Sequence, residues 1–486
     1  MTSSPPRRAR PLTSAEAGRV EWDLVVVGAG SAGLVGARTA AALGARVLLI
    51  EASGFGGECL YTGCVPSKAL IAAADAAHDA RAAARLGVHA GEVRVDFPAV
   101  MAHVKQAIAE IEPVDSPETL AKTGVHTLRG RARFDGHRSV VVEGVGIRFR
   151  DALIATGSSP IVPPRIDDVL TNETLWDLTE LPETLMVIGA GAVGCEIAQA
   201  MARLGSRVTL VHRGERVLPK EDPAASALVM AALRADGVEV RVGTTVETAE
   251  HTGGRTHARL SDGTTVIADR VLAALGRRVD TIGLGLDAAG VEVDDSGAIR
   301  VDRTLATSNP RIRAAGDATP LPRFTHTAGM FASVAATNAV LGLTRRIRLD
   351  DVPRVTFTSP EVAAVGVSTA ASESAGLRVV ETGHDDLDRA ITENLTAGFT
   401  RLAVDRKGRV VGATIVGPRA GESLGELSTA VSLGLTVRAL AGVMHAYPTY
   451  SDAGWNAAVR DAQSALRHGA VAAVIRLLRR VRRRRT

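Results

Sequence analysis

The sequence is poor in cysteine, in aromatic residues and in long apolar runs. Only three cysteines occur among 486 residues, which excludes a small fold held together by structural disulfides and favours a reducing compartment. No apolar run is long enough to cross a bilayer, and the first 21 residues lack the apolar core of a secretory signal. We therefore expect a cytoplasmic protein with a flexible extension over residues 1–21. Because aromatic residues make up 3%, the core must be built on Val, Ala and Leu, as in α/β layers.

Excess charge of one sign is also absent from most of the chain. The formal net charge is +4, and the seven arginines between Arg476 and Arg485 exceed it on their own, so the remainder is mildly acidic. This excludes nucleic-acid binding through a basic surface on the part of the chain before these arginines. Apolar residues recur at helical spacing among these arginines. Residues 470–485 can therefore form a basic amphipathic helix that touches an anionic membrane, and a solvated, frayed extension is the alternative.

Two of the three cysteines, Cys59 and Cys64, lie close together in a glycine-rich stretch. Pro66 suits the first turn of a helix, which places Cys64 at a helix N-terminus, where the dipole and the nearby Lys68 stabilise a thiolate. Residues five apart in a regular helix are separated by about 7.5 Å along the axis, so a disulfide needs a tighter backbone, which Gly63 permits. A structural metal site would need more ligands than this stretch offers. We interpret the two cysteines as a catalytic redox pair.

A glycine-rich turn between two apolar segments predicts a dinucleotide site near the start of the chain. A strand over residues 23–27 leads into Gly28, Gly30 and Gly33, then a helix and a second strand that ends at Glu51. The glycines allow a tight turn and a close approach of a pyrophosphate to the backbone, and the helix N-terminus faces the phosphates. Glu51 can accept hydrogen bonds from a ribose with free hydroxyl groups.

The same unit recurs later in the chain, which predicts a second dinucleotide site. Its glycines are Gly189, Gly191 and Gly194. Because the spacing is equal, the two copies can be overlaid, and the position of the first unit's acid falls on His212. Together with Arg213 and Arg216, this histidine can bind a 2′-phosphate, so the second site is predicted to favour NADPH. The alternative is that the three are ordinary surface residues of a loop.

The stretch from Gly56 to Lys68 carries a specific signature. Its two glycines, paired cysteines and Pro-Ser-Lys end resemble the active-site motif of the FAD-dependent pyridine nucleotide-disulfide oxidoreductases, the family of dihydrolipoamide dehydrogenase, glutathione reductase and mercuric reductase. The resemblance extends from about Asp23 to about Ala462. It implies an α/β fold with two Rossmann-like domains, for FAD and NAD(P)H, and an α+β C-terminal dimerisation domain. The expected boundaries are 22–157 with 277–348 for FAD, 158–276 for NAD(P)H, 349–465 for the dimerisation domain and 466–486 for a basic tail.

The resemblance also implies which further residues hold the cofactors. Gly57, Thr156 and Gly157 are expected to line the FAD site, and Asp317 is expected to bind the ribityl chain. Gly276 follows the second glycine-rich unit, in a segment that corresponds to the Thr156-Gly157 segment after the first unit.

Roles within the redox centre follow from the same resemblance. Cys64 is expected to form the charge-transfer thiolate beside the flavin, and Cys59 to be the interchange thiol that meets the acceptor. Glu196 resembles the family's partner of the active-site lysine, here Lys68, and the two are expected to set the field between nicotinamide and flavin. Cys195, inside the second glycine-rich helix, is expected to be a packing thiol.

The segment from His445 to Asp452 is similar to the family's His-x-His-Pro-Thr-x-Ser-Glu sequence but departs from it at the catalytic base. The base position holds Tyr447, and the orienting acid is Asp452. A tyrosine with a pKa near 10 is a poor general base at neutral pH, so we expect weak turnover of dithiols and better turnover of metal ions or quinones. His445 or His326 could supply an imidazole instead. Mercuric reductases typically carry a cysteine pair close to the C-terminus, and this chain has no cysteine after position 195.

Together these features predict a homodimeric flavoenzyme. NADPH, or less readily NADH, passes electrons through FAD to a Cys59–Cys64 disulfide and on to a disulfide, a metal ion or another small acceptor. The alternatives are an NAD(P)H:quinone or metal-ion reductase without disulfide exchange, a dihydrolipoamide dehydrogenase and a non-catalytic redox sensor. No resident metal is expected.

Overall fold

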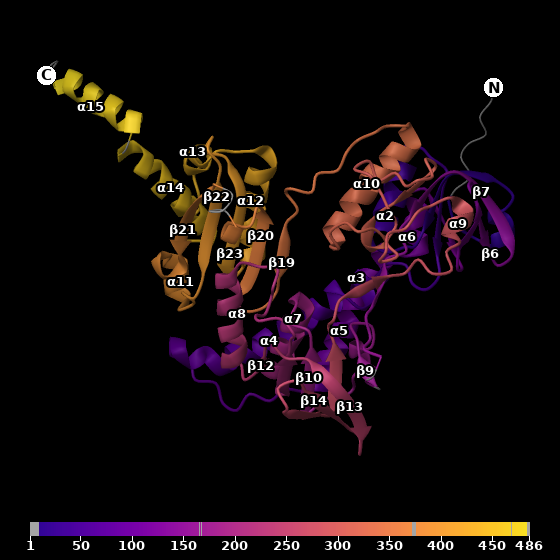
Figure 1. Cartoon of the computed structure of the whole chain (residues 1–486), viewed down its shortest axis with the longest axis horizontal. Coiled ribbons are helices and arrows are strands. Elements are labelled where there is room, and N and C mark those ends of the chain that lie inside the picture. The colour runs from indigo at the N-terminus through magenta and orange to yellow at the C-terminus, as the bar shows by residue number, and fades with distance from the viewer. Residues whose placement is uncertain (1–8, 165, 167, 372–375, 468, 484–486) are drawn as a thin grey trace. The chain divides into compact units, whose positions relative to one another are not determined.

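The computed structural model describes residues 9–164, 166, 168–371, 376–467 and 469–483 (Figure 1). The chain divides into two compact units, each built from separate stretches. Unit 1 comprises Met1–Ala73, Val95–Pro182 and Arg270–Arg348, and unit 2 comprises Ala74–Arg94, Glu183–Asp269 and Leu349–Thr486. Within the described residues, no helix is both long enough and apolar enough to span a membrane.

Unit 1 is built on an eight-stranded sheet in the order β1-β4-β3-β2-β7-β6-β5, with β18 also paired to β7. Neighbouring strands along the path β1-β4-β3-β2-β7 are parallel, and so are β7 and β18. Strands β5, β6 and β7 form an antiparallel meander. The strands are β1 (Pro11–Leu12), β2 (Glu21–Val27), β3 (Val47–Glu51), β4 (Val125–Arg129), β5 (Arg133–Gly136), β6 (Ser139–Val142), β7 (Val145–Ile154) and β18 (Ile312–Ala314). Residues 24–27 of β2 and 47–50 of β3 are continuous apolar runs because both faces of these central strands are covered.

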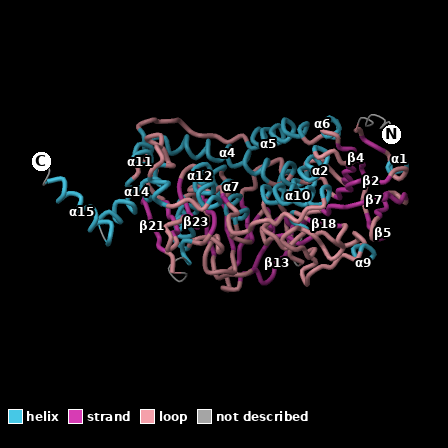
Figure 2. The backbone as a smooth tube through the Cα atoms, turned by 90° about the horizontal axis from the view of Figure 1, so that it is seen from above, coloured by secondary structure: helices cyan, strands magenta, loops and turns pink. Residues whose placement is uncertain are grey.

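Helices cover the sheet of unit 1, and α2 packs directly against α10 (Figures 1 and 2). The buried side of α2 is rich in Ala and Gly, which lets the second helix approach closely. The helices that lie wholly in unit 1 are α1 (Ser14–Ala17), α2 (Ser31–Ala42), α3 (Gly57–Tyr61), α5 (Phe97–Ile111), α6 (Pro117–Lys122), α9 (Leu286–Ala289) and α10 (Thr325–Leu341). Helix α4 (Cys64–Ala82) begins in this unit.

Part of the N-terminal segment expected to be flexible is folded. β1 pairs in parallel with β4 and so extends the sheet at its edge. The helix α1 that follows is closed by a capping box, in which Thr13 accepts from the N–H of Glu16 and the Glu16 carboxylate accepts from the N–H of Thr13. Two residues of strand and four of helix are too short to show a period in the sequence, which explains why a loose extension was expected. Residues 1–8 lie outside the described part of the chain.

Unit 2 contains the second glycine-rich nucleotide unit and the C-terminal sheet. β10 (Thr184–Ile188), β11 (Arg207–Val211) and β12 (Glu239–Arg241) run parallel, with α7 (Ala192–Leu204) and α8 (Pro223–Ala235) between them. An antiparallel three-stranded sheet follows, made of β13 (Val246–Thr252), β14 (Arg255–Leu260) and β15 (Thr265–Ala268).

The C-terminal part of unit 2 is an antiparallel sheet in the order β19-β20-β23-β22-β21, covered by helices. Its buried side packs apolar residues of β20, β22 and β23 against α12 to α14. The elements are β19 (Arg354–Thr356), β20 (Glu361–Gly366), β21 (Arg378–Gly383), α11 (Asp388–Glu393), β22 (Phe399–Val404), β23 (Val410–Gly417), α12 (Ala420–Leu433), α13 (Val437–Ala441), α14 (Asp452–Arg467) and α15 (Gly469–Arg483).

The unit boundaries differ from the domain boundaries expected at 157/158 and 276/277. Unit 1 continues to Pro182 and resumes at Arg270. The reason is strand pairing, because β8 (Ser158–Pro160) pairs with β17 (Arg277–Val279), and β9 (Val169–Leu170) pairs with β16 (Arg270–Ala273). The connections into and out of the NAD(P)H-binding segment are thus tied to each other by strand pairing.

Candidate functional site

The two cysteines lie on either side of a tight turn between α3 and α4. Cys59 is in α3, and α4 begins at Cys64, as the sequence predicts. A Cβ at Gly63 would lie 3.0 Å from the carbonyl oxygen of Glu58 and 3.3 Å from Cα of Cys59, so a side chain here would crowd the backbone of the turn. The Ser67 hydroxyl donates to the Gly63 carbonyl at 2.6 Å and holds the first turn of the helix in place.

The surroundings of the thiols distinguish the two cysteines. The two are not joined by a disulfide in this structure; Cys64 is exposed, and Cys59 is half-buried. A hydrogen bond with Cys64, together with burial, raises the pKa of the Cys59 thiol well above its ordinary value. The Sγ of Cys64 lies 3.4 Å from the hydroxyl of Thr325. A proton shared by the pair therefore resides on Cys59, which leaves the helix N-terminus to stabilise a thiolate at Cys64.

The first glycine-rich turn fits a dinucleotide. A Cβ at Gly28 would collide with the carbonyl oxygen of Ala155, and one at Gly33 would collide with that of Gly28, so neither position tolerates a side chain. Gly30 precedes the first residue of α2, and no side chain caps that helix. The buried hydroxyl of Thr156 has no hydrogen-bond partner within the described chain. An uncapped helix N-terminus and an orphaned hydroxyl beside it are what FAD would satisfy.

Gly57 and Glu51 complete this cleft. A Cβ at Gly57 would lie 2.5 Å from Cα of Gly30, so the redox loop and the nucleotide turn approach each other through two glycines. The Glu51 carboxylate is buried at the end of β3, where it accepts hydrogen bonds from the N–H of Ala29 at 2.6 Å and of Ser53 at 2.7 Å. The fold therefore places Glu51 where the sequence predicts an acid for the ribose.

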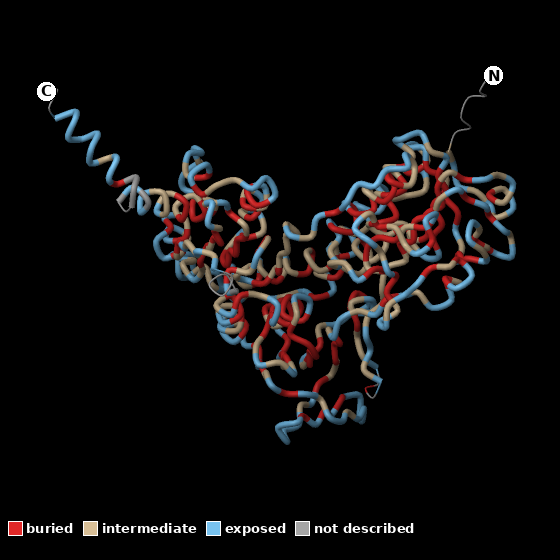
Figure 3. Tube along the Cα trace, turned by 45° about the horizontal axis from the view of Figure 1, so that its top comes forward, coloured by how far each residue is buried: buried red, intermediate tan, exposed pale blue. Residues whose placement is uncertain are grey.

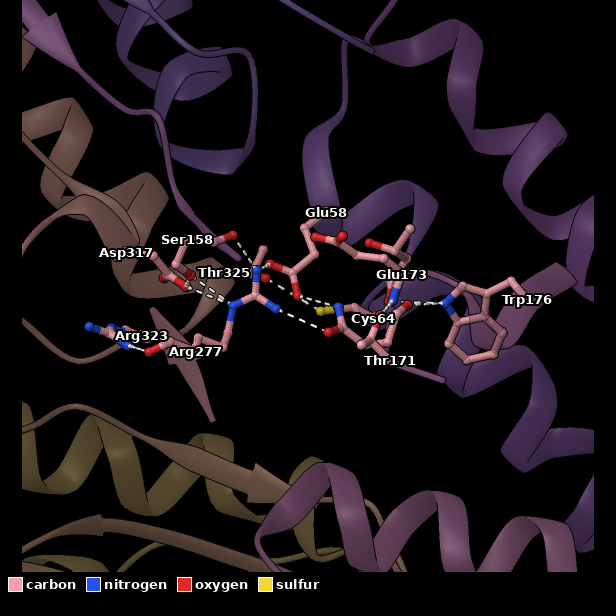
Figure 4. Close-up of polar contacts among 12 residues, drawn as sticks. Glu58, Cys64, Ser158, Thr171, Glu173, Trp176, Arg277, Asp317, Arg323 and Thr325 are labelled. Carbon is pink, nitrogen blue, oxygen red and sulfur yellow. Dashed lines mark hydrogen bonds and ion pairs between the residues drawn. The ribbon is translucent and has the colours of Figure 1, made fainter. Parts of the chain in front are cut away.

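A polar network extends from Asp317 toward the redox loop (Figure 4). The Ser158 hydroxyl donates to Asp317 at 2.7 Å, and Nε of Arg277 donates to the same hydroxyl at 2.7 Å. Gly157 and Gly276 both have positive φ, 76° and 105°, at the turns that bring these segments together. Sequence reasoning missed Arg277 as a site residue, although its position directly after the Gly276 turn is a signal that could have identified it.

The second glycine-rich unit reproduces the first in its hydrogen bonds. The N–H of Gly28 donates to the Ile50 carbonyl at 2.8 Å, and the N–H of Gly189 donates to the Val211 carbonyl at 2.8 Å. The N–H of Ala190 donates to Nδ1 of His212 at 3.4 Å, in the way that Ala29 donates to Glu51. The histidine thus occupies the position of the ribose-binding acid, as the overlay of the two sequences predicts. Gly191 precedes α7 without a side-chain cap, and Gly194 is buried inside that helix.

Basic residues follow His212 at the end of β11. Burial, and then Arg213, lower the pKa of His212, which agrees with its accepting a hydrogen bond as a neutral ring. Arg213 is exposed, whereas one Nη of Arg216 donates to the Pro219 carbonyl at 2.8 Å. Of the two arginines, Arg213 is therefore better placed to meet a ligand.

Tyr447 lies on the surface of unit 2, and its hydroxyl bonds to a carboxylate other than Asp452, the acid that the sequence predicts. Its side chain is 73% exposed, and its hydroxyl donates a hydrogen bond to Asp388 at the start of α11. Asp388 raises the pKa of Tyr447. Asp452 is buried and accepts from the N–H of Thr449 at 3.1 Å, so it holds the turn that carries the tyrosine. The carboxylate bonded to Tyr447 is thus one that sequence reasoning missed.

The alternative base His445 is already engaged. Its Nε2 lies 2.7 Å from the Glu426 carboxylate, and its Nδ1 lies 3.1 Å from the Val443 carbonyl. Both ring nitrogens of His445 therefore already have hydrogen-bond partners within unit 2. The second alternative, His326, stacks on Phe324 with ring centroids 5.3 Å apart.

The other two tyrosines are held by carboxylates. In unit 1, the Tyr61 hydroxyl donates to the Phe55 carbonyl at 3.0 Å and to Glu112 at 2.8 Å, and burial raises its pKa to about 12. In unit 2, the Tyr450 hydroxyl donates to Glu393 at 2.8 Å, and the side chain is buried. Both phenol hydroxyls are therefore engaged by carboxylates of their own unit.

The remaining predicted residues lie on helices of different units. Lys68 is on α4, one turn after Cys64, in unit 1. Glu196 is buried on α7 in unit 2, where its carboxylate accepts from the N–H of Phe357 at 2.9 Å. Their pairing stays a prediction. Cys195 is buried, and burial raises its pKa to about 12, as expected of a packing thiol.

This combination of nucleotide clefts and a cysteine pair defines a class of flavin-dependent disulfide reductases. Residues 22–335 match the family model described as pyridine nucleotide-disulphide oxidoreductase, and residues 352–458 match its dimerisation domain. The chain belongs to this family. The α/β fold, the redox-active disulfide chemistry, the cofactors FAD and a pyridine nucleotide, and the homodimer are thereby confirmed.

Individual relatives fall into several branches of the family. A mercuric reductase of Streptomyces lividans is 36% identical over 89% of this chain and 94% of its own length. A dihydrolipoyl dehydrogenase of Geobacillus stearothermophilus is 34% identical over 90% of this chain and 96% of its own length.

Solved structures with the same fold cover nearly the whole chain. LpdA of Mycobacterium tuberculosis superposes with a TM-score of 0.84 at 30% identity, over 91% of this chain and 99% of its own. The HOCl-induced flavoprotein disulfide reductase RclA of Escherichia coli, as a Cu(II) complex, superposes with a TM-score of 0.80 at 26% identity over the same shares.

Proposed function

We propose that this enzyme takes electrons from NADPH and delivers them through Cys59 and Cys64 to a metal ion or another small acceptor that is not a dithiol. FAD supplies the hydride-accepting chemistry between the nucleotide and the cysteine pair. Cys64 is the charge-transfer thiolate and Cys59 the interchange thiol. Lys68 and Glu196 set the field around the flavin and the nicotinamide.

The observation that carries the choice of acceptor is the hydrogen bond from Tyr447 to Asp388. Because Asp388 raises the pKa of the phenol, Tyr447 stays protonated at neutral pH and cannot deprotonate an incoming dithiol. A metal ion needs no such proton removal. The names of the relatives support this proposal, since mercuric reductases and a Cu(II) complex of a disulfide reductase are among them. A dihydrolipoamide dehydrogenase is the second candidate, supported by the 34% identity to a dihydrolipoyl dehydrogenase.

A panel of acceptors with purified enzyme and NADPH tests this function. We expect slow turnover of dihydrolipoamide and of glutathione disulfide, faster turnover of Hg(II) or Cu(II), and a gain of about 10² to 10⁴ in the dithiol reaction for Tyr447→His, since that is the usual contribution of a general base. The matched control is Tyr447→Phe, which keeps the ring and removes only the hydroxyl. Dihydrolipoamide turnover by the unmodified enzyme at the rate of a dedicated dehydrogenase would contradict the proposal.

We also propose that α15 contacts an anionic membrane surface from the cytoplasm. Val474, Leu477, Leu478 and Val481 follow one face of the helix and are 43–62% exposed, and Figure 3 draws α15 largely in the exposed colour. Five arginines of the helix, at positions 476, 479, 480, 482 and 483, are exposed with them. An exposed apolar face among cations complements anionic headgroups above acyl chains.

Co-sedimentation with liposomes of defined charge tests the membrane proposal. We expect binding to vesicles that contain phosphatidylserine, and loss of that binding when residues after Arg467 are removed. In the variant Leu477→Ser with Leu478→Ser, every arginine is kept and the apolar face is weakened, so binding should fall without a change in charge. Equal sedimentation of the full and shortened chains would rule out membrane docking by α15.

A further inference from the structure

Glu58 carries a carboxylate directly before the first redox cysteine, and none of the roles described above uses it. One carboxylate oxygen lies 2.5 Å from Nη2 of Arg277, and the other accepts a hydrogen bond from Nδ2 of Asn172 at 3.0 Å. The side chain is 37% exposed, so water can still reach it. Figure 4 shows the Glu58 carboxylate between Arg277 and the sulfur of Cys64. The group is therefore fixed beside the redox pair but remains open to solvent protons.

The cation that binds Glu58 is shared with a second carboxylate. Arg277 Nε lies 3.6 Å from Asp317, and its Nη2 also donates to the Ser158 carbonyl at 2.5 Å. Asp317 has a second donor in the Ser158 hydroxyl. One guanidinium thus serves two carboxylates, which leaves an excess of one negative charge before any thiolate forms.

Reduction of the cysteine pair adds a further negative charge to this cluster. The charged and titratable groups that face Glu58 are Arg277 from β17, Asp317 from the turn before α10, Cys64 from α4 and Glu173 from the loop after β9. Three of the four disfavour a charged Glu58 once Cys64 is a thiolate. Burial is the largest cause and raises the pKa of Glu58 to about 7, with Arg277 opposing it. A small change in local charge near neutral pH therefore changes the protonation of this carboxyl.

We propose that Glu58 is the redox-linked proton acceptor of the cysteine pair, protonated when the pair is reduced and ionised again when it is reoxidised. This inference rests on the redox roles proposed for Cys59 and Cys64. In this role Glu58 acts through the charge of the thiols, as a positioning residue.

Electrons and protons balance over one cycle of the pair. NAD(P)H supplies two electrons and one proton; the bond between the two sulfurs breaks, the proton resides on Cys59 as a thiol, and Cys64 keeps the negative charge as a thiolate. The Glu58 carboxylate then takes one proton from solvent and becomes a neutral carboxylic acid, so the charge of the cluster is unchanged. When the acceptor takes the two electrons, the bond between the two sulfurs forms again, and two protons leave the centre: one from the Cys59 thiol and one from Glu58.

Proton uptake during reduction is the direct test. Holoenzyme is reduced anaerobically with one equivalent of NADPH in weak buffer that contains a pH indicator, at a series of pH values around 7. For the unmodified enzyme we expect uptake of up to about one solvent proton per centre, greatest near pH 7, where the pKa of Glu58 lies. In Glu58→Gln this uptake should disappear, because the amide keeps the shape and hydrogen-bond acceptor of the side chain but does not titrate.

The matched control is Glu173→Gln. It removes an exposed carboxylate that influences the pKa of Glu58 less than Arg277, Asp317 or Cys64 does, so proton uptake should be nearly that of the unmodified enzyme. Uptake that is unchanged in Glu58→Gln, or lost equally in Glu173→Gln, would overturn the proposal. An enzyme with no long-wavelength absorbance from the Cys64 thiolate would instead refute the redox roles of the cysteines, and the two failures are thus distinguishable.

An infrared measurement on the unmodified enzyme provides a readout that needs no variant to fold. The reduced-minus-oxidised difference spectrum should gain a band of a protonated carboxyl group at pH 7 and lose its intensity above about pH 8, where Glu58 remains ionised in both states. A difference spectrum without such a band at any pH near neutrality would contradict the inference.

Discussion

The preference for NADPH can be tested by giving the second nucleotide unit the acid of the first. His212 occupies the position that Glu51 has in unit 1, and both accept a hydrogen bond from the N–H of the alanine after the first glycine. The variant His212→Glu therefore needs no rearrangement of the backbone, since the same chain already folds around a glutamate in this geometry. We expect the variant to favour NADH.

The size of the change follows from the groups involved. Loss of a charged hydrogen bond to the 2′-phosphate costs about 1.5–3 kcal/mol, and a carboxylate facing that phosphate adds a repulsion of similar size. The efficiency with NADPH should therefore fall by at least about 10²-fold. The ribose hydroxyls of NADH gain hydrogen bonds to the introduced carboxylate in place of the imidazole ring, so the efficiency with NADH should rise by about 10-fold.

Anaerobic stopped-flow reduction of the bound flavin measures this change without an acceptor. The second-order rate constant of flavin reduction is compared for NADPH and NADH, in the unmodified enzyme and in His212→Glu. The control is His257→Glu, which makes the same substitution at an exposed position on β14 of the same unit. A higher efficiency with NADH in the unmodified enzyme, or an unchanged ratio in His212→Glu, would refute the reasoning.

Two further predictions concern the redox pair and the pH dependence of nucleotide binding. Two-electron reduction should produce a long-wavelength charge-transfer absorbance that is lost in Cys64→Ser and retained in Cys59→Ser; an unchanged band in Cys64→Ser would reverse the assigned roles. Because burial and Arg213 lower the pKa of free His212 below its ordinary value near 6.5, the ring gains its charge only as the pH falls through that lowered pKa. The KM for NADPH should therefore decrease at acidic pH while that for NADH does not, and parallel profiles for the two nucleotides would contradict a role of His212 in binding the phosphate.

The sequence is most informative where function depends on backbone geometry. Glycine is the residue that fits where a Cβ would collide, and those collisions are local, so the turns at Gly28 and Gly189 can be read from spacing alone. The start of α4 at Cys64 follows in the same way from Pro66 and the alanine-rich run behind it. Equal spacing in the two units even predicts which residue takes the place of Glu51.

Partners of side chains were harder to predict, because they come from distant parts of the chain. Tyr447 bonds to Asp388, 59 residues earlier, and Glu58 is held by Asn172, 114 residues later. Asp452 matches the family's acid in position, but its carboxylate is satisfied by a backbone N–H three residues away. A motif specifies the residue type at a position and leaves the choice between a local and a distant partner to the tertiary fold.

Tyr447 and Glu58 together determine where a proton can reside during turnover. Asp388 raises the pKa of the phenol, so Tyr447 contributes no ionisation near neutral pH, whereas the pKa of Glu58 is about 7. The pH profile of acceptor reduction by the unmodified enzyme should therefore have one inflection near pH 7, and Glu58→Gln should remove it. With a dithiol as the substrate, Tyr447→His should add an inflection near the ordinary imidazole pKa of about 6.5, and this one should survive in the double variant because the imidazole does not depend on Glu58. An inflection near pH 7 that persists in Glu58→Gln with Tyr447 intact would assign the proton to another group.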